Sequence, residues 1–141
     1  MILLDTSVLS ELMRPAPSVA VMSWVGAQPL RSLYVTSITQ AEVLYGVLLL
    51  PAGKRRASIE MAAAAMFETE FAGRILPFGS DAAALYAQIA AERRRAGQPI
   101  SHFDAQIAAI ARATAAALAT RNIDDFAHCG IKVIDPWNDS G

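Results

Sequence analysis

The segment Ile2-Leu3-Leu4-Asp5-Thr6-Ser7 decides the fold class of this chain. A short apolar run that meets an acid and then two hydroxyl residues is typical of a buried strand that leads into a helix. Four more short apolar runs alternate with longer runs rich in Ala and Leu, which indicates βαβ units around a parallel sheet. The sequence therefore predicts an α/β fold, a three-layer sandwich in which helices flank a central parallel β-sheet of four to five strands.

The boundaries of the predicted elements follow from this alternation and from the Pro and Gly residues near the helix ends. Strands are expected at residues 2–5, 33–36, 74–78, 117–120 and 131–134. Helices are expected at residues 7–13, 19–27, 40–50, 54–71, 81–96 and 104–116. With 141 residues and no segment typical of a linker, the chain is predicted to form a single domain over residues 1–141.

Composition excludes several classes of protein. Hydrophobic residues make up 54% of the chain and charged residues 18%, which excludes a disordered protein. The 12 basic and 13 acidic residues give a net charge of -1, so nucleic acid can bind only through local patches or bound cations. The single cysteine, Cys129, excludes an intramolecular disulfide, and the longest strongly apolar run, residues 43–50, is far shorter than the roughly 20 residues of a membrane span. We expect a cytoplasmic protein without a membrane segment.

Three acids stand in apolar sequence and are therefore candidates for a functional site. Asp5 ends the first predicted strand, at the edge where open α/β sheets bind ligands. Glu42 is the only charged residue in the segment 32–53, and Asp104 opens a helix whose buried face it shares with apolar residues. An unpaired carboxylate on a buried face costs several kcal/mol, so Asp104 requires a partner.

Each of these acids also has a purely structural interpretation. Asp5 would then accept a hydrogen bond from a loop amide. Glu42 would complete a capping box with Thr39, in the first turn of its helix. Asp104 would follow a capping serine, Ser101, at the same spacing. The sequence alone leaves both kinds of interpretation open.

A fourth polar loop, Thr120-Arg121-Asn122-Ile123-Asp124-Asp125-Phe126, follows the predicted strand at 117–120. Because the carboxyl ends of parallel strands share one edge, we expect the acids of four segments to meet in one cleft. Carboxylates within ~5 Å repel by about 1 to 4 kcal/mol per pair, depending on the effective dielectric constant. A hard divalent cation removes this repulsion, and oxygen ligands favour Mg²⁺ or Mn²⁺ over zinc. Such an ion would activate water for attack on a phosphodiester.

Four motif blocks, in this order and at this spacing, resemble the PIN-domain ribonucleases, and among them the bacterial toxins of VapC and FitB (plasmid-stability) type. The blocks are Leu4-Asp5-Thr6-Ser7, residues 37–42 with Gly46, residues 99–111, and residues 119–122 with Asp125-Phe126. The resemblance extends over nearly the whole chain, from Ile2 to Trp137.

The resemblance implies a role for several residues of these blocks. Asp5, Glu42 and Asp104 are implied as the catalytic, metal-binding acids. Asp125 is the preferred fourth acid, but some members of the family carry an acid where Asn122 stands, so both residues stay candidates. Supporting positions are Thr6, Ser7, Thr120 and Asn122. The resemblance also implies Mg²⁺ or Mn²⁺ as cofactor, endonucleolytic cleavage of RNA, an antitoxin whose C-terminal segment occupies the active-site groove, and a homodimer.

Basic residues supply the contacts that RNA phosphates need. Arg121 adjoins the fourth loop and is the preferred phosphate contact, although pairing with Asp124 is an alternative. Residues 93–95 are three arginines in the last turn of a predicted helix, where we expect a solvated helix terminus.

Two other functions stay open on the sequence. One is a non-catalytic subunit that docks a partner, such as an inactive toxin that acts with its antitoxin on DNA. The other is an aspartyl-phosphate phosphatase with Asp5 as nucleophile, although Ser7 stands where such enzymes usually have a second acid. A requirement for Mg²⁺ or Mn²⁺ in RNA cleavage separates the nuclease from the docking subunit.

Overall fold

The computed structural model describes residues 1–138 and contains one sheet of five parallel strands, in the order β3-β2-β1-β4-β5. The strands are β1 (Ile2–Leu4), β2 (Leu33–Thr36), β3 (Ile75–Leu76), β4 (Ala117–Ala119) and β5 (Val133–Ile134). The chain builds the sheet outward from β1 to β3 and then returns to place β4 on the other side of β1. Open α/β sheets form their ligand crevice at the carboxyl end of the strands where the order reverses in this way. The predicted parallel sheet is confirmed, and its switch point lies between β1 and β4.

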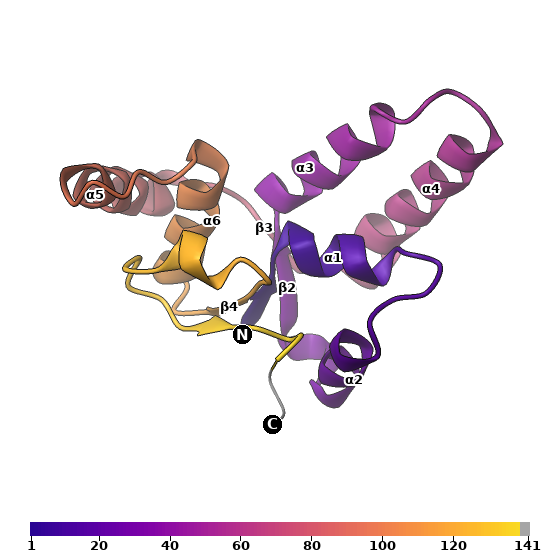
Figure 1. Cartoon of the computed structure of the whole chain (residues 1–141), viewed down its shortest axis with the longest axis horizontal. Coiled ribbons are helices and arrows are strands. Elements are labelled where there is room, and N and C mark those ends of the chain that lie inside the picture. Colours follow the sequence, from indigo (N-terminus) through magenta and orange to yellow (C-terminus); the bar gives the residue numbers. More distant parts are fainter. Residues whose placement is uncertain (139–141) are drawn as a thin grey trace.

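Helices cover both faces of this sheet. They are α1 (Thr6–Leu12), α2 (Val19–Ala27), α3 (Ser37–Leu48), α4 (Lys54–Ala65), α5 (Ser80–Arg95) and α6 (His102–Ala113). Three short helical turns complete the described elements: η1 (Leu30–Ser32), η2 (Met66–Glu70) and η3 (Ile123–Phe126). Figure 1 shows α5 and α6 on one side of the sheet and α1 to α4 on the other, with α3 and α4 forming an arm that projects from the body. The predicted three-layer sandwich is confirmed.

The central strands divide their side chains between two hydrophobic cores. Leu3 and Leu118 lie in the core beneath α5 and α6, whereas Leu4 and Ala119 lie in the core beneath α1 to α4. All four side chains are buried, because successive residues of a strand point to opposite faces and both faces are covered here. The near-continuous apolar sequence of the strands follows from this double burial.

Several element boundaries differ from the predicted ones. Helix α3 begins at Ser37, directly after β2, because the Thr36 side chain accepts a hydrogen bond from the Thr39 amide at 3.0 Å and caps the helix there. The helix predicted at 54–71 ends as α4 at Ala65 and continues as the π-helical turn η2. The outer strands β3 and β5 have two residues each, shorter than predicted. Edge strands make hydrogen bonds on one side only, so fewer residues meet the definition of a strand.

Two predictions concern the chain as a whole. Among residues 1–138, no helix has both the length and the apolar composition that crossing a bilayer requires. The prediction of one domain over residues 1–141 stays a prediction, and residues 139–141 lie outside the described part of the chain.

Candidate active site

Asp5 lies at the carboxyl end of β1, next to the switch point of the sheet. Its side chain is 5% exposed and its backbone amide donates to the Ala119 carbonyl of β4 at 2.9 Å. Carboxylate oxygen Oδ2 accepts hydrogen bonds from the hydroxyls of Thr120, at 2.7 Å, and Ser7, at 3.1 Å. Although Asp5 occupies the cap position of α1, its side chain makes no capping bond. The structural interpretation of Asp5 as the acceptor of a loop amide is therefore wrong.

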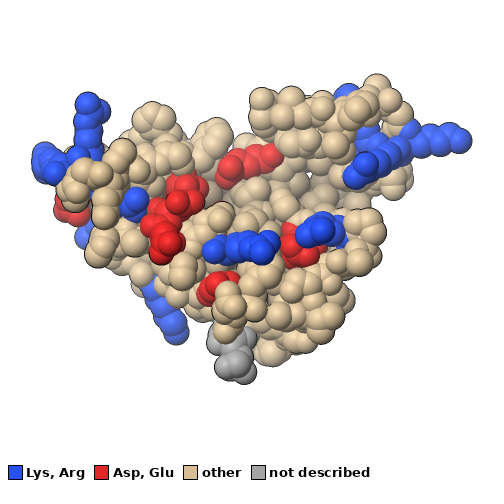
Figure 2. All heavy atoms as spheres, in the orientation of Figure 1, with Lys and Arg blue, Asp and Glu red and all other residues tan. Residues whose placement is uncertain are grey.

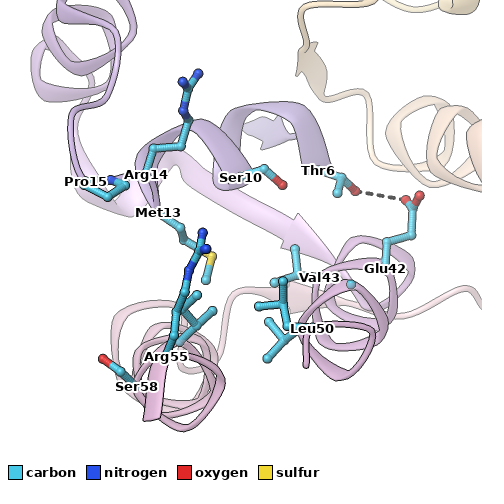
Figure 3. Close-up of a pocket in the computed structure, with 13 residues that line it drawn as sticks. Thr6, Ser10, Met13, Arg14, Pro15, Glu42, Val43, Leu50, Arg55 and Ser58 are labelled. Carbon is cyan, nitrogen blue, oxygen red and sulfur yellow. Dashed lines mark hydrogen bonds between the residues drawn. The ribbon is translucent and has the colours of Figure 1, made fainter. Parts of the chain in front are cut away.

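Glu42 lies in the second turn of α3 and faces the start of α1. The Thr6 hydroxyl donates to Glu42 Oε1 at 2.9 Å, as Figure 3 shows. Because α3 begins at Ser37, Glu42 is outside the first turn, and the interpretation of Glu42 as part of a capping box is wrong. Burial raises the pKa of the Glu42 carboxyl above its ordinary value, and the bond from Thr6 opposes this shift. The negative charges of Asp5 and Asp104 raise the pKa further.

Asp104 is the third residue of α6, directly above the buried face of that helix. Its amide donates to the Ser101 hydroxyl at 3.2 Å, so the predicted cap at Ser101 is present. Its side chain is half-buried, and burial raises the pKa of the carboxyl, while hydrogen bonding to Ser101 lowers it. The negative charges of Asp5 and Asp125 raise the pKa of Asp104 in addition. The cap explains why α6 begins at this point. It does not explain why the Asp104 carboxylate lies near the carboxylates of Asp5 and Asp125.

We call Asp5, Glu42, Asp104 and Asp125 the acidic edge. Asp5 follows β1 directly, and the other three acids belong to α3, α6 and η3. Their charges act on one another at the carboxyl end of the sheet. Figure 2 shows acidic side chains around the hollow between the α3–α4 arm and the α5–α6 side of the molecule. Within residues 1–138, no three His, Cys, Asp or Glu side chains are close enough to enclose a metal ion by themselves. The predicted acids thus share one edge but form an open set.

The chemistry of this donor set fits a hydrated hard cation. All four side chains offer carboxylate oxygens, the ligands that Mg²⁺ and Mn²⁺ prefer. Mg²⁺ is usually bound through one or two carboxylates and keeps several of its waters, so an open set suits it better than a closed cage. Burial, and after it the neighbouring carboxylates, raises the pKa values of Glu42 and Asp104, so their ionised forms are disfavoured here and a bound cation would favour them.

The fourth loop is tied to the start of α1 by hydroxyl groups. Thr120 is fully buried, and its hydroxyl accepts from the Asn122 amide at 3.1 Å while it donates to Asp5. The Ser7 hydroxyl accepts from the Arg121 amide at 3.2 Å. The supporting residues Ser7 and Thr120 therefore lie at the site, whereas Asn122 reaches it through its main chain. Asp125 is exposed, and its carboxylate acts on Asp104 from η3.

The main chain of Arg121 is bonded to Ser7, close to Asp5, and within residues 1–138 no carboxylate lies within ion-pair distance of its side chain. The ion pairs within residues 1–138 join Arg14 to Glu11 and Arg56 to Glu60, so the alternative pairing of Arg121 with Asp124 is wrong. The Arg121 guanidinium instead lies over the indole ring of Trp137, 5.1 Å from its centroid. This cation–π contact holds the side chain while leaving its N–H groups able to bind an anion.

The structure also reveals site residues that the sequence did not single out. Thr39 is fully buried and accepts a hydrogen bond from the Thr6 hydroxyl at 3.3 Å, so it supports the residue that bonds Glu42. Arg93 was expected at a solvated helix terminus, but its side chain is buried. The sequence identified Thr39 only as a capping partner of Glu42 within the motif block 37–42, and Arg93 only as one of three consecutive arginines.

A recess of about 560 Å³ leads away from Glu42 between α1, α3 and α4. Figure 3 shows Thr6 and Glu42 at one end of it and Arg14 and Arg55 at the other. The wall between the two ends is mostly apolar, formed by Met13, Val43, Gly46, Val47, Leu50 and Ile59. The recess is thus continuous with the acidic edge and carries opposite charges at its two ends.

Comparison with known proteins relates the whole chain to one family. The family described as PIN domain matches residues 2–132. VapC ribonuclease Y4jK from Sinorhizobium fredii is 40% identical over 137 residues, 97% of this chain and 98% of that protein. Toxin FitB from Neisseria gonorrhoeae is 40% identical over 139 residues, 99% of this chain and 100% of that protein. In the solved structure of FitAB bound to an IR36 DNA fragment, a 38% identical chain gives a TM-score of 0.93, covering 100% of this chain and 99% of that chain.

Proposed function

The chain belongs to the PIN domain family, and we propose that it is a Mg²⁺- or Mn²⁺-dependent endoribonuclease, the toxin of a VapBC- or FitAB-type toxin–antitoxin pair. One observation carries this proposal: Asp5 and Glu42 are held at the carboxyl edge of the sheet by the hydroxyls of Thr120, Ser7 and Thr6. Asp104, at the start of α6, is near enough for the charges of these carboxylates to act on one another. A fold that retains such repulsion without using it would lose stability for no gain. The names of the relatives, a ribonuclease and a toxin, support the same activity.

In the proposed activity the acids of the acidic edge bind the ion, and the hydroxyl residues around them orient the acids. Asp5, Glu42, Asp104 and Asp125 would hold the ion and the water around it. When bound, a divalent ion lowers the pKa of water and stabilises negative charge on phosphoryl oxygens. The hydroxyls of Ser7 and Thr120 fix Asp5, and the hydroxyl of Thr6 fixes Glu42, so the carboxylates are oriented before any ligand arrives. Asn122 is the alternative to Asp125 as the fourth residue.

The RNA backbone requires positive contacts beside this negative edge. Arg121 supplies one, because its guanidinium is held over Trp137 and its main chain is bonded to Ser7 next to Asp5. A guanidinium makes two parallel hydrogen bonds to a phosphate. Arg121 would therefore place a backbone phosphate close to the acidic edge.

The recess between α1, α3 and α4 suits the antitoxin. Its apolar wall would take apolar side chains of the antitoxin's C-terminal segment, and its charged ends would pair with charges of opposite sign. The structures of FitAB and of other toxin–antitoxin complexes support a partner of this kind for the present chain. Because Glu42 lies at one end of this recess, a segment bound along it would block access to the acidic edge.

We further propose a cytoplasmic homodimer. The second half of α3 and the residue that follows it expose four large apolar side chains, Leu44, Tyr45, Leu48 and Leu49. A contiguous exposed apolar stripe of this kind is typical of an interaction surface. Sedimentation of the purified chain would give the mass of the assembly.

The decisive experiment is cleavage of RNA by the purified chain with and without Mn²⁺. Total RNA is incubated with the protein, the cut ends are mapped, and the same is done in chelator. We expect endonucleolytic cuts that require the ion. An Asp5→Asn variant purified in parallel controls for contaminating nucleases, since a contaminant would cleave in both preparations.

The non-catalytic alternative gives a different result in the same experiment. A docking subunit binds its antitoxin in chelator and cleaves nothing at any Mn²⁺ concentration. Cleavage that is equal in the wild-type and Asp5→Asn preparations, or that persists in chelator, would contradict the proposed nuclease.

A further inference from the structure

Arg93 lies in the last turn of α5 and behaves unlike its two arginine neighbours. Its side chain is 7% exposed, whereas Arg94 and Arg95 are exposed. No carboxylate of residues 1–138 is within ion-pair distance of it, since the ion pairs in this part of the chain involve other residues. A buried, unpaired cation costs several kcal/mol unless hydrogen bonds compensate for the lost water. The contacts of this guanidinium therefore require an explanation.

The guanidinium compensates for its burial almost entirely with main-chain carbonyl groups. Its Nε donates to the Gln98 carbonyl at 2.7 Å, in the turn that follows α5. Its Nη1 donates to the carbonyls of Asp125, at 3.0 Å, and Ala127, at 2.8 Å. A weaker contact joins Nη1 to the Cys129 sulfur at 3.7 Å. One side chain thus ties the end of α5 to the fourth loop.

The bonds to Asp125 and Ala127 bracket Phe126, which is 1% exposed in the core beneath α5 and α6. Within the loop itself, the Asp125 amide donates to the Asn122 carbonyl at 3.1 Å. The Asp125 side chain is exposed, so its position depends on how firmly this main chain is held. The bonds from Arg93 and the burial of Phe126 both join this part of η3 to the rest of the molecule.

We propose that Arg93 is a positioning residue, which holds the Asp125 carboxylate beside Asp104 by fixing the main chain of η3. The consequence for ion binding rests on the proposed function, because it requires that the acidic edge binds a divalent cation. The effect of Arg93 on the main chain of the loop is independent of the proposed function. Arg93 acts through another residue and touches neither RNA nor ion.

The charge of Arg93 has an opposite effect, which a test must separate from the positioning. Burial is the largest influence on the pKa of Asp104, and the positive charge of Arg93 lowers that pKa. Removing the charge would by itself strengthen binding of a cation at the acidic edge. Replacing Arg93 by Met therefore changes two things at once. Replacing it by Lys keeps the charge and removes the planar fork that reaches several carbonyls.

The test uses the full chain as Arg93→Lys, with Arg94→Met as the exposed neighbour in the same turn. Amide hydrogen exchange over residues 123–129 reports on the loop, and the Mn²⁺ electron-paramagnetic-resonance signal reports on ion binding. We expect Arg93→Lys to accelerate exchange in this loop and to weaken Mn²⁺ binding about 10-fold, the usual cost of losing a group that orients a metal ligand. Arg94→Met should change neither measurement.

An Asp125→Asn background shows whether the effect passes through Asp125. There we expect Arg93→Lys to weaken Mn²⁺ binding less than about 2-fold, because coupled residues are not additive. Equal weakening in both backgrounds, or unchanged exchange over residues 123–129, would overturn the proposal. Arg93→Met distinguishes a purely electrostatic role, in which Mn²⁺ binding tightens and Arg93→Lys has no effect. If the wild-type chain binds no Mn²⁺, the proposed function fails, and the exchange measurement still decides whether Arg93 holds the loop.

Discussion

Helices α4 and α6 have the same length and a similar alanine content, yet they differ in almost every structural respect. Each has 12 residues, but α6 buries six of them and α4 only Ala63. Helix α6 packs between the sheet and α5, whereas α4 belongs to the arm in Figure 1 and borders the recesses of about 560 and 380 Å³. Since tertiary packing of a buried face, more than helix propensity, stabilises a helix, we expect α6 to be held more firmly than α4.

In the proposed function this difference would separate two tasks. Asp104, carried by α6, would need a fixed position relative to the carboxyl ends of the strands. The arm borders a recess with an apolar wall, which would accommodate a partner segment. The contrast between the two helices leads to the following expectations.

The largest effect is expected from Asp5→Asn, directly after β1, the strand that contributes to both hydrophobic cores. Cleavage of RNA should fall to the level of a protein-free control, because the proposed site loses one of its carboxylates. The metal-free fold should be as stable as the wild type or more stable, since one source of repulsion is removed. Urea unfolding in chelator measures this stability. Asp124→Asn, an exposed acid of η3, is the matched control and should retain cleavage. Unfolding of Asp5→Asn would make Asp5 structural.

The second prediction compares the two helices directly by the same substitution in each. Ile107 of α6 is 1% exposed, so Ile107→Ala should lower the free energy of unfolding by about 2–5 kcal/mol. Ile59 of α4 is partly buried and lines both recesses, so Ile59→Ala should cost about 1 kcal/mol. Denaturant unfolding of both variants gives the two values. Equal costs would mean that α4 is held as firmly as α6.

The smallest expected effect concerns pH. It involves Glu42 of α3, in the arm, and Asp104 of α6. Burial and neighbouring carboxylates raise the pKa values of Glu42 and Asp104 in the folded chain above those of the unfolded chain. Between the two pKa values the folded chain binds more protons, so its stability decreases as pH rises through this window. In chelator, Glu42→Gln/Asp104→Asn should therefore be more stable than wild type at neutral pH, with the advantage shrinking as pH falls toward the ordinary carboxyl range. A pH-independent difference would contradict this prediction.

The candidate site could be predicted from the sequence because its acids stand out from their surroundings. Asp5, Glu42 and Asp104 each interrupt an apolar segment, and the parallel sheet predicted from the short apolar runs directs strand ends to one edge. The structure brings these acids and Asp125 to that edge, while their roles as metal ligands stay a prediction. The local interpretation of Glu42 failed because the cap at Thr36 moves the start of α3.

The hydroxyl contacts of the site could not be predicted, because they join residues far apart in the chain. The bond from Thr6 to Glu42 spans 36 residues and that from Thr120 to Asp5 spans 115. No local pattern encodes which hydroxyl reaches which carboxylate. Arg93 is a similar case, since Arg94 and Arg95, which follow it, have the same side chain but are exposed.

The amino-acid sequence by itself determined the class of fold, the order of its elements and the acids that interrupt its apolar segments. These features are local, since burial on both faces makes a strand apolar throughout and leaves a single carboxylate conspicuous. The tertiary structure alone establishes which hydroxyls orient the acids, and that Arg93 is buried with its guanidinium bonded to the main-chain carbonyls on either side of Phe126. Those features depend on the relative placement of distant segments, which packing of the two cores sets and which no short stretch of sequence specifies.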